Sequence, residues 1–174
     1  MIPEGSGTEV YGRNREMETL FEKAVKIVKK NGEELIERDG ADAIREKGRT
    51  DYVTEVDVRV QRQIFEALKE LDPAAQFLGE EKENQGIDRE GRIWILDPVD
   101  GTTNLIHDFQ HSTISLAYAK GGKVRFGVVY DPFREECFTA ELGKGAFLNG
   151  RPIQVSGKKR LDDCLIAIGT SPGC

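Results

Sequence analysis

Apolar residues recur at three- and four-residue intervals in two segments near the start of the chain, and each segment predicts an amphipathic helix. The first helix is expected over residues 14–31, where Asn31-Gly32 would end or kink it. The second is expected after the N-cap residue Thr54, and Asp72-Pro73 should stop it. The apolar positions are Met17, Leu20, Phe21, Ala24, Ile27 and Val28 in the first segment, and Val60, Ile64, Leu68 and Leu71 in the second.

The second half of the chain has a different pattern, with short apolar runs between turns that contain glycine. Residues 112–119 and 124–130 predict two strands of a hairpin, joined at Gly121-Gly122. Other short runs predict further strands at residues 76–79, 136–140, 152–155 and 164–168. Two helices followed by strands with tight turns indicate an α+β fold, in which the helices pack on one face of a mostly antiparallel sheet of about six strands. We expect residues 1–13 to form a flexible arm and residues 14–174 to form the domain.

A central stretch between these two halves combines an apolar run with two acids. Residues 93–96 predict a short buried strand that ends at Asp97, and Pro98 stiffens a turn before Asp100. Gly101, Thr102 and Thr103 can then open a helix whose first backbone N–H groups are free to bind an anion. Because carboxylates suit a hard cation, the stretch predicts a metal ion and a phosphate held side by side.

Composition and charge narrow the classes of protein that this chain can be. Its 174 residues can build one domain with a core, and a net charge of −6 argues against a nucleic-acid-binding protein. No apolar run approaches the ~20 residues of a membrane span, and the first residues do not resemble a signal peptide. The three cysteines are widely spaced and suggest a reducing compartment. We therefore expect a cytoplasmic protein with no membrane partner.

Five acids stand at the edges of predicted helices and strands: Asp57, Glu80, Glu81, Asp97 and Asp100. If the strands before Glu80 and Asp97 are parallel neighbours, these carboxylates meet at one edge of the sheet and raise one another's pKa. A divalent cation would remove that repulsion, and an oxygen-rich ligand set suits Mg²⁺, or alternatively Mn²⁺, better than zinc.

Each of these features also has an interpretation without function. Glu80-Glu81 can be a solvated charge pair, Asp57 can serve only to cap a helix, and Lys47 can be a surface lysine. Asp97 and Asp100 can be turn formers, but turn chemistry does not explain the Gly-Thr-Thr-Asn that follows. Gly79-Glu80-Glu81 together with Asp97-Pro-x-Asp-Gly-Thr is a far less probable coincidence than either piece alone.

With these motifs the sequence resembles the inositol monophosphatase family, part of a lithium-sensitive, magnesium-dependent sugar-phosphatase superfamily. The resemblance covers the chain from about residue 14 to its end, and it implies the N-terminal half of a layered αβαβα fold. The segments that carry it are Asp51-Tyr-Val-Thr-Glu-Val-Asp57, Phe77-Leu-Gly-Glu-Glu81, Trp94-Ile-Leu-Asp-Pro-Val-Asp-Gly-Thr-Thr-Asn104, Phe126-Gly-Val-Val-Tyr130 and Gly143-Lys-Gly-Ala-Phe-Leu-Asn-Gly150.

The resemblance implies roles for individual residues. The first Mg²⁺ would be held by Glu80, Asp97 and the Val99 carbonyl, and the second by Asp97 and Asp100. Asp57 and Thr102 would orient and deprotonate the attacking water, with Glu81 and Lys47 beside the site. Asp100, Gly101, Thr102 and Thr103 would contact the substrate, whose phosphate would meet backbone N–H groups.

The resemblance also implies a second α/β domain with a Trp-Asp-x-x-Ala motif, which this sequence does not contain. We therefore expect an N-terminal fragment of a magnesium-dependent phosphatase that acts on inositol monophosphate, and a homodimer is what the family suggests. Two alternatives remain. The chain can be a non-catalytic fragment that binds metal, or it can come from a relative that acts on fructose bisphosphate, NADP or adenosine bisphosphate.

Overall fold

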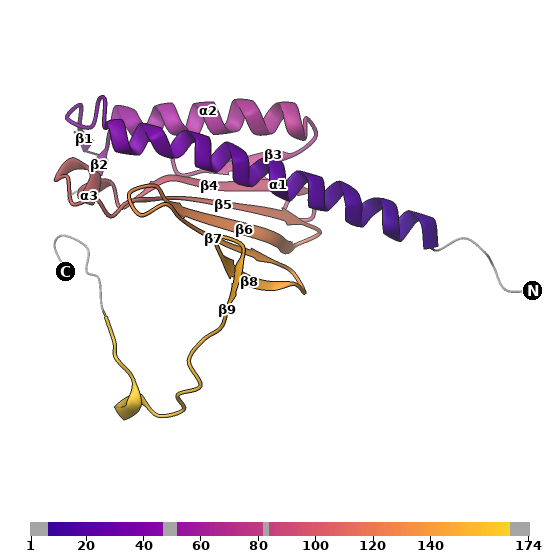
Figure 1. Ribbon diagram of the computed structural model, residues 1–174. Coiled ribbons are helices and arrows are strands. Elements are labelled where there is room, and N and C mark those ends of the chain that lie inside the picture. Colours follow the sequence, from indigo (N-terminus) through magenta and orange to yellow (C-terminus); the bar gives the residue numbers. More distant parts are fainter. Residues whose placement is uncertain (1–6, 47–51, 82–83, 168–174) are drawn as a thin grey trace, which may run out of the picture.

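The fold is an α+β layer in which two long helices cover one face of a seven-stranded sheet (Figure 1). The computed structural model describes residues 7–46, 52–81 and 84–167. The helices are α1 (Gly7–Glu37), α2 (Glu55–Leu71) and the short α3 (Thr102–Ile106). The strands of the large sheet are β3 (Gln76–Gly79), β4 (Arg92–Asp100), β5 (Thr113–Lys120), β6 (Lys123–Asp131), β7 (Glu136–Glu141), β8 (Gly145–Leu148) and β9 (Arg151–Ile153). The sequence-based prediction of an α+β fold is confirmed.

The large sheet has the order β3-β4-β5-β6-β7-β8-β9, so its strands are neighbours in chain order. Only β3 and β4 are parallel, and each later neighbouring pair is antiparallel. A separate two-stranded sheet pairs β1 (Arg45–Glu46) with β2 (Tyr52–Val53). The single parallel pair has a functional consequence, because it brings the carboxyl ends of β3 and β4 to the same edge of the sheet.

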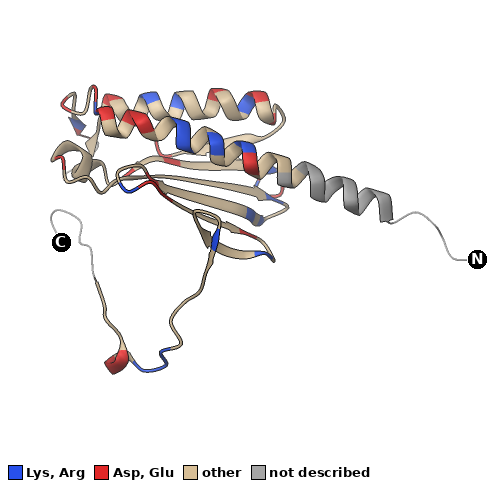
Figure 2. Cartoon of the chain, viewed as in Figure 1, with Lys and Arg blue, Asp and Glu red and all other residues tan. Residues whose placement is uncertain are grey.

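The core lies between the sheet and the two long helices. Trp94, Tyr118 and Phe126 stand in register on three adjacent strands, and their rings pack at centroid distances of 4.6–5.7 Å. Apolar residues of the long helices pack on this layer, and Val60 and Ile64 of α2 are fully buried. Figure 2 shows charged residues along both long helices, while the middle strands of the sheet are mainly uncharged. The apolar positions whose spacing predicted the two helices are therefore positions that contribute to this core.

The first helix is longer at both ends than its sequence predicts. It begins at Gly7, so residues 7–13 of the expected arm are helical, and it continues through Asn31-Gly32 to Glu37. Asn31 stays in the helix because its side-chain amide donates to the Ile27 carbonyl at 2.8 Å. Gly32 lies where a β-carbon would come within 2.5 Å of the Tyr130 ring, so the glycine allows α1 to approach β6 closely. Tertiary packing, and not a helix end, explains this glycine.

Two strand predictions are also corrected. β4 does not end at Asp97 but continues to Asp100, with an irregular register between these two acids where it pairs with β5. The strand expected at residues 164–168 does not form in its described part. Residues 161–163 form a 3-10 turn, and the chain then runs extended and exposed, with Leu165 fully accessible to solvent. Figure 1 shows this C-terminal segment leading away from the sheet. No described helix has the length and apolar character to cross a membrane.

Candidate active site

The parallel ends of β3 and β4 bring two predicted site acids together. The backbone N–H of Glu80 donates to the Leu96 carbonyl at 3.2 Å, which continues the pairing of the strands by one residue. Asp97 follows Leu96 directly, so the Glu80 and Asp97 side chains leave the same edge of the sheet. The parallel neighbouring strands expected from the sequence are present, although Asp97 lies within β4 and not at its end.

Asp97 has the most perturbed carboxyl at this edge. Its pKa is raised from 3.8 to about 7, first by burial, then by a side-chain hydrogen bond with Glu80 and by the charges of Glu80 and Asp100. The Val99 backbone N–H donates to Asp97 Oδ1 at 3.1 Å and opposes this shift. A hydrogen bond between two carboxyls requires a proton on one of them, and the raised pKa of Asp97 favours its protonated form at lower pH.

Asp57 and Thr102 form the second polar centre of the site. Thr102 Oγ1 lies 2.9 Å from Asp57 Oδ1 and 3.1 Å from the Val99 carbonyl oxygen. The other oxygen of Asp57 accepts from the backbone N–H of Thr54 at 2.8 Å and from the Thr54 hydroxyl. Asp57 is almost fully buried at 1% exposure. It therefore caps α2, as predicted, and also binds a residue of the predicted phosphate turn.

Gly101 makes the sharp turn between β4 and α3. Its φ of 94° lies in the left-handed region, where a side chain would be strained, and α3 begins at the next residue. Thr102 and Thr103 occupy the first helical positions, whose backbone N–H groups have no acceptor within the helix. The Gly101 carbonyl accepts from Ser112 Oγ at 2.8 Å, which fixes the turn against the start of β5.

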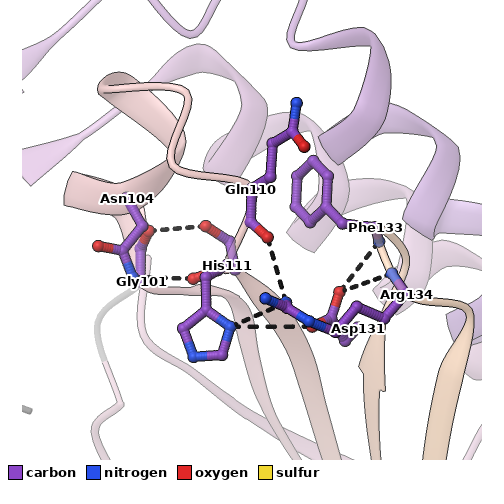
Figure 3. Close-up of polar contacts among 8 residues, drawn as sticks. Gly101, Asn104, Gln110, His111, Asp131, Phe133 and Arg134 are labelled. Atoms are coloured by element: carbon purple, nitrogen blue, oxygen red, sulfur yellow. Dashed lines mark hydrogen bonds and ion pairs between the residues drawn. The ribbon is translucent and has the colours of Figure 1, made fainter.

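A cluster of side chains holds the loop after α3, as Figure 3 shows. Asn104 Nδ2 donates to the His111 carbonyl at 2.8 Å. The Arg134 guanidinium contacts the Gln110 carbonyl at 3.2 Å, His111 Nδ1 at 3.0 Å and Asp131 Oδ2 at 2.7 Å. Asp131 is buried and also accepts from the backbone N–H of Phe133 and Arg134. This Arg134 clamp joins the β6–β7 turn to the loop that follows the predicted phosphate turn.

The turn after β3 is held by two amide side chains. Asn84 pairs with both backbone groups of Gly79, donating to the carbonyl at 2.6 Å and accepting from the N–H at 3.1 Å. Gln61, from α2, accepts a hydrogen bond from the Glu81 N–H at 3.0 Å. Glu80 itself is exposed, and Glu81 is half-buried.

A pocket of about 310 Å³ opens beside these groups, on the sheet face opposite the two long helices. The residues that line it include Glu80, Asn84, Asp97, Ser115 and Ala117. Ser115 stands opposite Asp97 in the β4–β5 register. The acidic pair is therefore reached from solvent through a concave surface of a size that suits a small ligand.

The acids do not form a ready-made metal cage. Among the residues that the structure describes, no group of three or more His, Cys, Asp or Glu side chains has metal-ligand geometry. Glu80 and Asp97 bond to each other, and Asp100 reaches Asp97 only through its charge. The donor chemistry nevertheless fits a hard cation, because the Glu80 and Asp97 carboxyls both line the pocket and carboxylate oxygens are the ligands that such a cation prefers.

The remaining predicted site residues differ in where the structure places them. Thr103 is half-buried in the first turn of α3, and Asp100 is exposed at the end of β4. Lys47 lies outside the described residues. Sequence reasoning missed Gln61, Asn84, Ser112 and Arg134, which hold the site turns. Of these, Gln61 carried a signal, since it lies four residues after Asp57 on the same side of a predicted helix.

The fold and this constellation define a class of α+β protein whose strand-end acids lie beside a Gly-Thr-Thr turn. The sequence model of the inositol monophosphatase family matches residues 16–172. The chain belongs to that family, and the resemblance inferred from its motifs is confirmed.

Individual relatives agree with this assignment. The chain is 38% identical over 161 residues to the Nus factor SuhB of Pseudomonas aeruginosa, covering 88% of this chain and 58% of that protein. It is 45% identical over 125 residues to the inositol-1-monophosphatase of Rhizobium meliloti, covering 71% of this chain and 47% of that protein. The chain thus spans about half the length of these relatives.

Solved structures show the same correspondence. The extragenic suppressor protein suhB of Bartonella henselae superposes with a TM-score of 0.78 at 38% identity, covering 84% of this chain and 57% of that one. An inositol monophosphatase of Thermotoga maritima superposes with a TM-score of 0.74 at 35% identity, covering 83% and 56%. The fold described above is therefore the fold of the matching half of these proteins.

Proposed function

We propose that the protein hydrolyses a phosphomonoester, inositol monophosphate, in a Mg²⁺-dependent reaction with water as the nucleophile. The observation that supports this proposal is the Asp57–Thr102 hydrogen bond together with the Glu80–Asp97 pair, since the reaction needs a proton acceptor and carboxylates that can hold a cation. Relatives named as inositol monophosphatases support the substrate class. One similar structure, a staphylococcal inositol monophosphatase, is described as inositol monophosphate bound.

The acidic edge would hold the cation. Glu80, Asp97 and the Val99 carbonyl would contribute oxygen ligands, Asp100 would complete a second position, and Glu81 and Lys47 would lie nearby. When bound, Mg²⁺ or Mn²⁺ would offset the charge of the phosphate and promote ionisation of water. A proton on Asp97 would leave on binding. Lithium inhibition belongs to the same proposal, and one similar staphylococcal structure is described as a lithium-soaked inhibitory complex.

Thr102 and Asp57 would take the proton of the attacking water. Because a threonine hydroxyl has one proton, Thr102 can donate to Asp57 while a lone pair of its oxygen accepts from water. As the water oxygen bonds to phosphorus, its proton passes to Thr102 and the Thr102 proton passes to Asp57. The phosphorus–oxygen ester bond breaks, and the alcohol oxygen takes a proton from solvent. The N–H groups of Gly101, Thr102 and Thr103 would bind the phosphate oxygens.

Location and assembly complete the proposal. The described cysteines Cys137 and Cys164 are both free, which is compatible with a reducing cytoplasm. The acidic net charge argues against nucleic acid as a partner, and it is compatible with a small phosphorylated substrate because a bound cation can reverse the local charge. A homodimer remains part of the proposal, to be checked by light scattering.

The test is phosphate release from inositol 1-phosphate by the full 174-residue chain, with Mg²⁺ and with a chelator. We expect release that requires Mg²⁺ and that is lost in Asp97→Asn. Mg²⁺ binding without release from any ester would favour the non-catalytic alternative. A panel that includes fructose 1,6-bisphosphate tests the substrate, because a Thermotoga maritima relative, 39% identical, is named fructose-1,6-bisphosphatase/inositol-1-monophosphatase. NADP and adenosine bisphosphate belong to the same panel.

A further inference from the structure

We propose that Gln61 is a positioning residue that fixes the Glu80–Glu81 turn to α2 and thereby sets the separation of Glu80 from Asp97. This inference rests on the proposed function, since it concerns how the cation-binding edge is built. Gln61 touches neither substrate nor cation in this role. It acts through the backbone of the residue next to Glu80.

The contact is buried and directional. Gln61 has 7% of its surface exposed, and its Oε1 accepts from the Glu81 N–H at 3.0 Å. The donor is a backbone N–H, so the atom that faces it must be the amide oxygen. A residue without an acceptor at position 61 would remove this bond from the Glu81 N–H. The bond therefore selects one conformation of the turn.

The glycine of the Gly-Glu-Glu motif makes room for this contact. A β-carbon at Gly79 would collide with Gln61 Oε1 and would come within 2.9 Å of the Phe65 ring. The backbone angle of Gly79 is not in the left-handed region, so its conformation does not require glycine. The requirement is spatial, because the Gln61 side chain passes over the backbone of residue 79 to reach Glu81.

The same helix holds both halves of the candidate site. Asp57 and Gln61 are four residues apart on α2, hence on one face of the helix. Asp57 bonds to Thr102, after β4, and Gln61 bonds to Glu81, after β3. Together with the bond from the Glu80 N–H to the Leu96 carbonyl, these two contacts of α2 would fix the distance between the turns and so the separation of Glu80 from Asp97. Removing a residue that orients a metal ligand through a hydrogen bond typically weakens metal binding about 10- to 100-fold.

The experiment compares Gln61→Met, Gln61→Glu and Gln63→Met with the parent chain. Methionine keeps the length and volume of glutamine but lacks the acceptor, whereas glutamate restores it. Gln63 is the matched control, because it lies on the same helix and donates to the half-buried Glu34 side chain of α1 and not to the Glu80–Glu81 turn. Amide exchange of Glu81, measured by NMR without metal, reports the contact itself. Mn²⁺ binding, measured by calorimetry, reports its consequence.

We expect Gln61→Met to exchange the Glu81 amide at least tenfold faster and to weaken Mn²⁺ binding about 10- to 100-fold. Gln63→Met should change neither, and Gln61→Glu should keep Glu81 protection near that of the parent. An unchanged Glu81 exchange rate in Gln61→Met would overturn the inference. So would unchanged Mn²⁺ affinity in that variant while Asp97→Asn loses binding, and the proposed function would then stand. A parent chain that does not bind Mn²⁺ would overturn the proposed function, and with it the metal role of Gln61.

Discussion

Thr102 and Asp57 are separated by 45 residues in the chain, and their side-chain oxygens lie 2.9 Å apart. Asp57 is held in place by the N-cap of α2, and Thr102 is held by the turn after β4, where its hydroxyl also reaches the Val99 carbonyl. The proton acceptor is therefore fixed by a helix start, and the hydroxyl that would pass it a proton is fixed by a strand end. Neither group depends on a long flexible side chain.

Replacing Thr102 tests this pair directly. Thr102→Val has nearly the same shape but no hydroxyl, so water would lose its path to Asp57. We expect turnover to fall by about 10²- to 10⁴-fold, the usual size of a proton-transfer contribution, while Mg²⁺ affinity stays within about threefold. Thr102→Ser should recover most of the activity. Phosphate release and calorimetry would provide both measurements. Loss of turnover that Thr102→Ser does not recover would argue against the hydroxyl.

The pH dependence of stability tests the Asp97 environment. The Asp97 carboxyl has a pKa of about 7 in the folded protein against 3.8 ordinarily, so between these values the folded state binds a proton that the unfolded state has released. Stability is therefore fully present below about pH 4 and is lost as the pH rises toward 7. Asp97 is half-buried, so we expect a loss of only about 1–2 kcal/mol in metal-free protein.

Asp97→Asn cannot titrate at this position, so its stability should lack that decline. Urea unfolding at pH 4.5 and pH 8, with chelator, gives the comparison between variant and parent. Added Mg²⁺ should restore the parent at pH 8 and leave the variant almost unchanged, because binding to the folded state alone stabilises it. A parent and variant with the same pH dependence would contradict the assigned pKa.

Local sequence patterns predicted the elements of this fold well, and they failed where distant packing decides the outcome. The cap at Thr54 and the hairpin at Gly121-Gly122 are encoded by neighbouring residues, and both are present. Gly32 predicted a helix end, but its role depends on Tyr130, almost a hundred residues later. The strand expected at residues 164–168 has the right residues, but no described strand lies beside it.

In the candidate site, too, local sequence patterns predicted some residues, and others depend on distant packing. The acids and the Gly-Thr-Thr turn are visible because Gly79-Glu80-Glu81 and Asp97-Pro-x-Asp-Gly-Thr occur together, which is far less probable by chance than either motif alone. Gln61 was not identified, because glutamine on a helix is ordinary until the position of Glu81 is known. Residues that hold a site through single hydrogen bonds depend on three-dimensional neighbours, and one sequence without its fold does not reveal them.

The Arg134 clamp should contribute measurably to stability. Asp131 is buried, with its side chain 6% exposed, and Arg134 is its ion-pair partner at 2.7 Å. Arg134→Met leaves that oxygen without this partner, so we expect a loss of about 1–3 kcal/mol in the free energy of unfolding. Arg160→Met is the control, because the Arg160–Asp162 pair is exposed and should contribute at most about 1 kcal/mol. Urea unfolding measures both, and equal losses would show that the clamp is no stronger than a surface ion pair.

Gly32 offers a test in which local and distant effects have opposite signs. In the middle of an exposed helix, glycine to alanine would stabilise by about 1 kcal/mol. In α1 the new β-carbon would meet the Tyr130 ring at 2.5 Å and the Pro132 side chain at 3.0 Å, which forces α1 away from β6. We expect Gly32→Ala to destabilise by about 1–3 kcal/mol, the usual range for overpacking. Gly157→Ala is the control, because nothing lies near its added methyl group. Thermal unfolding of both variants decides the matter, since a stabilised Gly32→Ala would mean that α1 does not pack this closely on β6.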